Sequence, residues 1–108
     1  MATLILPVDN SSASYDFQVQ LENAWYRIEL YFNFRVGYWF LSCYDGSENM
    51  LVAGRKVVLG ANLLGRGVDP ALPPGFIFAV DTSGQNLDAG YDDLGGRVLL
   101  TYVESTGP

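Results

Sequence analysis

The sequence contains no histidine and only one cysteine among its 108 residues. Without histidine, a Ser-His-Asp triad, an imidazole general base and a histidine-based metal site are excluded. The single Cys43 cannot form an intrachain disulfide, and one cysteine is too few for a cysteine-based zinc site within one chain. Because its neighbours in sequence are aromatic and apolar, we interpret Cys43 as a buried structural residue.

Charged residues are also scarce. Only 17% of the residues are charged, a low share for a small domain with a large surface-to-volume ratio. We therefore expect another molecule to cover part of the apolar surface. Twelve acidic residues against six basic ones give a formal charge of −6, which opposes binding to the phosphate backbone of nucleic acids.

A secretion signal and a long hydrophobic run are absent as well. The apolar run Leu4-Ile5-Leu6 stops at Pro7 and has no basic residue before it, unlike a signal peptide. No segment approaches the length of a membrane span. We therefore expect synthesis in a cytoplasm and no membrane segment.

The sequence does contain strand-like runs separated by residues that stop strands. Residues 15–21 and 25–34 alternate apolar and polar side chains, and the turn between them predicts a hairpin. Residues 38–44 are apolar on both faces and are predicted to pair antiparallel with residues 50–59. Gly54 predicts a bulge or bend in the second of these runs. Two further strand-like runs are residues 76–81 and 97–104.

These runs predict an all-β fold: a small compact antiparallel barrel or sandwich with long Gly- and Pro-rich connections. At most one short helical turn is expected, over residues 61–64. We expect a single β domain over residues 1–108, with a core at 14–104 and a possible extended arm at 1–13. The side chains expected to be mostly buried are Tyr26, Ile28, Leu30, Phe32, Trp39, Leu41, Val57, Phe78, Val98 and Leu100.

Two loops match ligand-binding motifs only in part. Residues 60–67 have the glycine spacing of a phosphate-binding loop, but Arg66 replaces its lysine and Gly67 its hydroxyl residue. Residues 81–88 offer oxygen ligands, but they lack the spacing and the final glutamate of a calcium-binding EF-hand. We interpret both as ordinary connections and expect no cofactor and no metal.

Two carboxylate pairs are the remaining route to hydrolysis, Asp92 with Asp93 and Asp45 with Glu48. Adjacent residues of an extended strand point to opposite faces, so Asp92 and Asp93 need turn geometry to converge. We favour solvated turns and expect no enzymatic activity.

The aromatic residues Trp25, Tyr31, Trp39 and Tyr91 suit either packing and interfaces or a sugar-stacking platform. In a strand-rich fold the first interpretation is favoured. A carbohydrate- or ligand-binding module that uses Trp25, Trp39 and Tyr91 is the alternative function.

The first part of the chain contains three notable segments: WYRIEL at 25–30, YWFLSCYD at 38–45 and GRKVVLGANLL at 54–64. They are followed by PGFIFAVD at 74–81 and by residues 92–104. Their order and spacing resemble a family of small baseplate plug proteins from contractile-tailed phages, of the cyanophage type. The resemblance covers about residues 14–104.

The resemblance implies a non-enzymatic structural subunit of the tail baseplate, near the hub and spike that close the central channel. It implies other hub or spike proteins as partners, several copies in a cyclic assembly, and a place in the virion after assembly in the bacterial host cytoplasm. The low charge and the aromatic content suit such contacts. The residues we expect at interfaces are Leu4, Ile5, Leu6, Trp25, Tyr31, Tyr38 and Tyr91.

The arm at residues 1–13 has two possible placements. It can add an edge strand to a neighbouring subunit, or it can pair within its own sheet.

Because the 60–67 loop lacks the lysine and hydroxyl of a phosphate-binding loop, the chain is expected to bind no ATP. Replacing Arg66 by alanine should leave calorimetric titration with Mg-ATP unchanged and without a binding signal. Saturable, magnesium-dependent binding that the replacement abolishes would contradict the structural interpretation of this loop.

Overall fold

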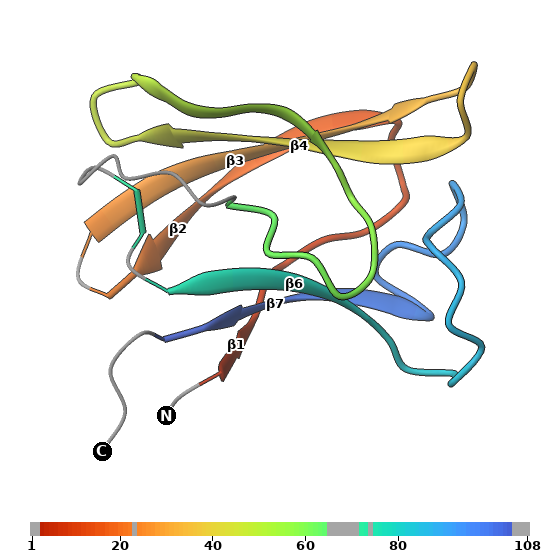
Figure 1. Ribbon diagram of the computed structural model, residues 1–108. Helices are drawn as coiled ribbons and strands as arrows, with labels where there is room; N and C mark the ends of the chain where they lie inside the picture. The colour runs from red at the N-terminus through yellow and green to blue at the C-terminus, as the bar shows by residue number, and fades with distance from the viewer. Residues whose placement is uncertain (1–2, 23, 65–71, 74, 105–108) are drawn as a thin grey trace.

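The computed structural model describes residues 3–22, 24–64, 72–73 and 75–104, and these residues form two antiparallel sheets (Figure 1). One sheet has the strand order β2-β3-β4-β5, and the other has the order β1-β7-β6. The strands are β1 (Thr3–Ile5), β2 (Ser14–Leu21), β3 (Ala24–Asn33), β4 (Tyr38–Asp45), β5 (Met50–Lys56), β6 (Phe76–Asp81) and β7 (Val98–Val103). The sheets lie face to face as a sandwich, which confirms the all-β prediction and decides against a closed barrel.

The hairpin predicted from the alternating residues is confirmed. β2 pairs with β3 without interruption from Ser14↔Tyr31 to Leu21↔Ala24. Alternation along both strands sends one set of side chains, which includes Ile28 and Leu30, into the core between the sheets. The other set faces outward and is largely polar on β2.

The bulge predicted at Gly54 is also confirmed. Leu41 pairs with Arg55 but Cys43 pairs with Val52, so β5 contains an extra residue between these pairs. Gly54 adopts a φ of 52°, a conformation that a side chain disfavours. The Gly54 N–H, displaced from the ladder, donates a 2.9 Å hydrogen bond to the hydroxyl of Ser42.

β5 ends at Lys56, so the prediction that this strand continues to Leu59 is wrong. After Lys56 the chain crosses to the other sheet, where Leu59 forms an isolated parallel bridge with Ala79 of β6. No helix forms among the described residues, and the helical turn expected at 61–64 is replaced by a tethered turn. There the Asn62 side-chain oxygen accepts hydrogen bonds from the N–H groups of Leu64 and Ile77, each at 3.2 Å.

The N-terminal segment pairs within its own sheet, the second of the two placements that the sequence allowed. β1 lies antiparallel to β7, with Thr3 opposite Val103 and Ile5 opposite Thr101. Leu6 continues the contact, since its N–H donates to the carbonyl of Leu100 at 2.9 Å. β7 is therefore the central strand of its sheet, with β1 on one side and β6 on the other.

The core between the sheets contains eight of the ten side chains predicted to be buried. The exceptions are Phe32 and Phe78, which are only partly buried. Phe32 lies near the end of β3, where it packs against Trp39 with 5.4 Å between ring centroids. Phe78 lies opposite Thr101 on the outer side of its sheet, because Ile77 and Ala79 are the β6 residues that face the core.

Cys43 is fully buried in this core, as expected for a structural residue. Burial, with a smaller contribution from the charge of Asp45, raises the pKa of the thiol to about 12. The thiol is therefore protonated at neutral pH and is a poor nucleophile. No helix in the described part of the chain is long and apolar enough to cross a membrane.

Replacing Leu30 or Leu100 by alanine should lower the free energy of unfolding by about 2–5 kcal/mol, because both side chains are fully buried and leave a cavity. Urea denaturation of the purified chain measures this loss. Leu87, which is 56% exposed, is the matched control, and its replacement by alanine should cost less than about 0.5 kcal/mol. Equal losses at all three positions would show that the strand registers are wrong.

Candidate functional site

The outer side of the β1-β7-β6 sheet is almost entirely apolar. The pairings Phe76↔Val103, Phe78↔Thr101 and Val80↔Leu99 place these side chains on one side, because paired residues of antiparallel strands point the same way. Ile5 joins them from β1, since it lies opposite Thr101. We call this surface the apolar face; its described side chains are Ile5, Phe76, Phe78, Val80, Leu99, Thr101 and Val103.

The apolar face is accessible to a partner. Ile5 is 58% exposed, Phe76 44% and Val80 43%, and the other members are partly buried by their neighbours. Among the described side chains of the face, Thr101 alone is polar and none carries a charge. A contiguous apolar surface of this kind on a soluble domain is typical of a protein interface.

The outer side of the β2-β3-β4-β5 sheet differs because charge and aromatic rings cover it together. Arg27 forms 2.9 Å ion pairs with Asp16 and Glu48, and its guanidinium lies 4.0 Å from the ring centre of Tyr44. The hydrogen bond to Glu48 is the largest cause of a raised pKa for Arg27. These charges are already paired within the chain.

The side chains predicted at interfaces are not brought together. Ile5 lies on the apolar face. Leu4, opposite Tyr102, points to the other side of the strand and is 43% exposed, and Leu6 is buried in the core. The remaining predicted residues lie elsewhere: Trp25, Tyr31 and Tyr38 on the outer side of the other sheet, and Tyr91 against Trp39. The sequence interpretation missed most of the apolar face, because it places Phe78 in the core and assigns no other residue of 76–81 to an interface.

The sugar-stacking platform proposed from Trp25, Trp39 and Tyr91 does not form. Trp39 has no exposed surface, and its ring N–H donates a 3.0 Å hydrogen bond to the carbonyl of Gly90. Tyr91 stacks on Trp39 with 5.8 Å between ring centroids, so its ring packs against the core. Trp25 is 58% exposed but belongs to the outward-facing set of β3. The alternative function therefore loses the geometry on which it depended.

Asp81 and Arg97 organise the loop that was compared with a calcium site. The Asp81 carboxylate accepts hydrogen bonds from the N–H and hydroxyl of Ser83, from the N–H of Leu87, and from Arg97 at 2.7 Å. Burial raises the pKa of Asp81, but these hydrogen bonds outweigh it and hold the pKa well below its usual value. The carboxylate thus binds its own loop, and no cluster of metal ligands exists in the described part of the chain.

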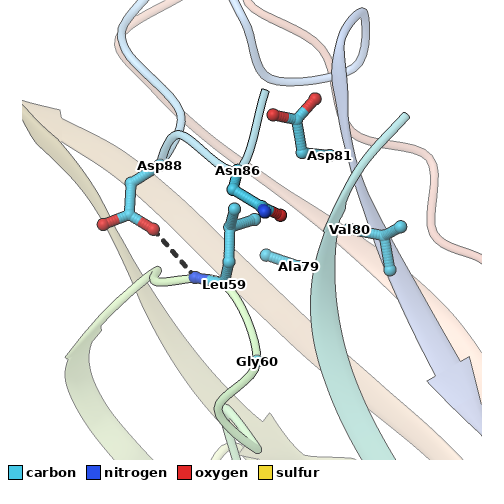
Figure 2. Close-up of a pocket in the computed structure, with 7 residues that line it drawn as sticks. All are labelled: Leu59, Gly60, Ala79, Val80, Asp81, Asn86 and Asp88. Atoms are coloured by element: carbon cyan, nitrogen blue, oxygen red, sulfur yellow. Dashed lines mark hydrogen bonds between the residues drawn. The ribbon is translucent and has the colours of Figure 1, made fainter. Parts of the chain in front are cut away.

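A shallow cleft of about 570 Å³ lies beside this loop (Figure 2). It is lined by Leu59, Gly60, β6 residues 79–81, Asn86 and Asp88. The Asp88 carboxylate accepts a 2.9 Å hydrogen bond from the N–H of Leu59, which ties the crossing segment to the loop (Figure 2). The cleft is open, and both of its carboxylates have bonds within the chain, so it does not form a built ligand site.

Neither carboxylate pair has the arrangement of a hydrolase. Asp93 bonds Arg97 at 2.9 Å and the N–H of Gly90, while its neighbour Asp92 is exposed. Asp45 accepts hydrogen bonds from the N–H groups of Ser47 and Asn49 and so caps a turn. The loop compared with a phosphate-binding motif has Gly65, Arg66 and Gly67 outside the described residues.

The chain is a small β-sandwich with an uncharged apolar face, and the carboxylates of Asp45, Asp81, Asp88 and Asp93 are bonded within the chain. These are the features of an assembly subunit. The chain belongs to the family described as the cyanophage baseplate Pam3 plug gp18, whose model matches residues 3–105. The match includes β1, which the resemblance seen in the sequence did not cover. No curated protein matches the chain. The chain is therefore a structural component of a phage tail baseplate.

Replacing Arg97 by glutamine should lower the thermal midpoint at pH 7, because Asp81 and Asp93 lose the cation that they share. Folding lowers the pKa of each of these two carboxyls. The two carboxylates therefore stabilise the folded state above the unfolded pKa of about 3.9, and this stabilisation is lost as pH falls through the folded pKa. The difference from wild type should therefore shrink below about pH 4.

Thermal unfolding followed by circular dichroism from pH 7 to pH 2 measures this difference. Arg55, which is exposed and makes no ion pair with any described residue, is the matched control for replacement by glutamine. A midpoint difference for Arg97→Gln that stays constant across this pH range would contradict the role given to the two carboxylates.

Proposed function

We propose that this chain is a non-enzymatic subunit that plugs or organises the tail-tip hub around the central channel of the baseplate. The observation that carries the proposal is the apolar face, which gives a soluble domain a surface suited to permanent contact with hub or spike proteins. Several copies in a cyclic arrangement, assembled in the bacterial host cytoplasm, fit this role.

The charge of the chain supports a position at the channel. A net charge of −6 repels the phosphates of passing DNA, so a subunit at the mouth of the conduit does not retain them. Obligate contacts with neighbours also explain why a chain with so few charged residues exposes Ile5, Phe76 and Val80.

Replacing Val80 by aspartate in the phage should exclude the subunit from tails. The introduced carboxylate would be buried, without a cation to pair with it, in an apolar interface. Val80 is 43% exposed in the single chain, so the variant should still fold. Quantitative mass spectrometry of purified tails, with circular dichroism of the purified chain, measures both properties.

Leu87→Asp is the matched control, because Leu87 is 56% exposed and lies in a loop outside the apolar face. Tails should contain this variant at the wild-type level. Normal incorporation of Val80→Asp would refute the docking role of the face, and tails that lack the subunit yet keep their DNA and infectivity would refute the plug function.

A further inference from the structure

Among the described strands, three of the four sheet edges are protected against the addition of a further strand. β5 carries two register shifts against β4, and bulges of this kind disrupt an edge. β6 is covered by the crossing segment, through the Leu59↔Ala79 bridge and the hydrogen bond from the N–H of Leu63 to the carbonyl of Ile77. β1 has only three residues.

β2 is the long and regular edge. Its eight residues pair with β3 without a register shift, and the strand contains neither proline nor lysine. The carbonyl of Ala13 accepts from the N–H of Phe32 at 2.7 Å, which places the backbone groups of odd-numbered β2 residues toward β3. The backbone groups of the even-numbered residues therefore point to the open edge.

One end of this edge is already closed. The Ser12 hydroxyl donates to the carbonyl of Ser14 at 3.0 Å and accepts from its N–H at 3.3 Å. The edge-facing N–H and C=O groups of Asp16, Gln18 and Gln20 form no hydrogen bond with any described residue. All three residues are exposed. They form a continuous template for a further strand.

We propose that the strand that pairs here is β2 of a second copy of this chain, antiparallel about a two-fold axis at Gln18. In this register Gln18 lies opposite Gln18 of the second copy, and Asp16 lies opposite Gln20. Each of the three open residues donates one backbone hydrogen bond and accepts one, so the register uses the template fully and leaves the capped Ser14 outside it.

The charges permit this contact although the chain as a whole is acidic. Asp16 is the only charged residue of β2, and its carboxylate is paired with Arg27 of the same chain at 2.9 Å. The register keeps the two Asp16 side chains apart, because each faces a neutral glutamine. On the core side, Phe17 lies opposite Val19 of the second copy, and both side chains are only partly buried in the single chain.

The proposal does not use the apolar face, so it can be tested on the purified full chain independently of the baseplate role. Gln18→Cys should form an intermolecular disulfide under mild oxidation, since hydrogen-bonded partners lie about 5.5 Å apart between Cα atoms, within the range of a disulfide. Cys43 does not compete because it is buried. Gln20→Cys is the matched control and should give little dimer, because its partner position is Asp16.

A second measurement does not depend on oxidation. Light scattering should give the wild-type chain the mass of a dimer, and Gln18→Pro should halve it, because proline lacks the N–H that the axis requires. Gln18 does not use its N–H toward β3, so the variant keeps the wild-type circular dichroism spectrum. A monomeric wild-type chain, equal crosslinking of both cysteine variants, or a folded but dimeric Gln18→Pro would overturn the proposal.

Discussion

The strict alternation of side chains along β6 and β7 is the constraint on which the rest of the structure depends. Every residue of these strands that does not face the core must face outward, and no strand among the described residues forms a second layer over the outer side of this sheet. Ile77 and Leu100 fill the core, so their neighbours Phe78 and Leu99 are turned outward. The apolar face follows directly from apolar residues at both sets of positions.

The other sheet meets the same constraint differently. Its inner positions are largely apolar too, but its outer positions include Arg27 and Asp16, and Arg27 forms ion pairs with Asp16 and with Glu48 of the β4–β5 turn. The loop that follows β6 likewise uses Arg97 to form ion pairs with both Asp81 and Asp93. Charge in this chain stabilises turns and one outer face, which agrees with a structural member of the baseplate plug family.

The sequence predicts the local features well and the site poorly, for a physical reason. The hairpin of β2 and β3 and the bulge at Gly54 depend on near neighbours and on the conformational freedom of glycine. Residues 76–80 are apolar at both parities, so their pattern cannot show which side faces the core. The apolar face also depends on the pairing of β1 with β7, strands at opposite ends of the chain, and no local signal in the sequence reveals that register.

The position of β7 between β1 and β6 determines when this surface can exist during synthesis. β1 leaves the ribosome first, but its pairing partner is the last strand to emerge, so the three-stranded sheet cannot form cotranslationally in sequence order. Ile5 and Val80 share a surface only after Val103 has been made. A nascent polypeptide that ends before β7 therefore lacks this surface, and recruitment through it is restricted to chains in which translation has passed β7.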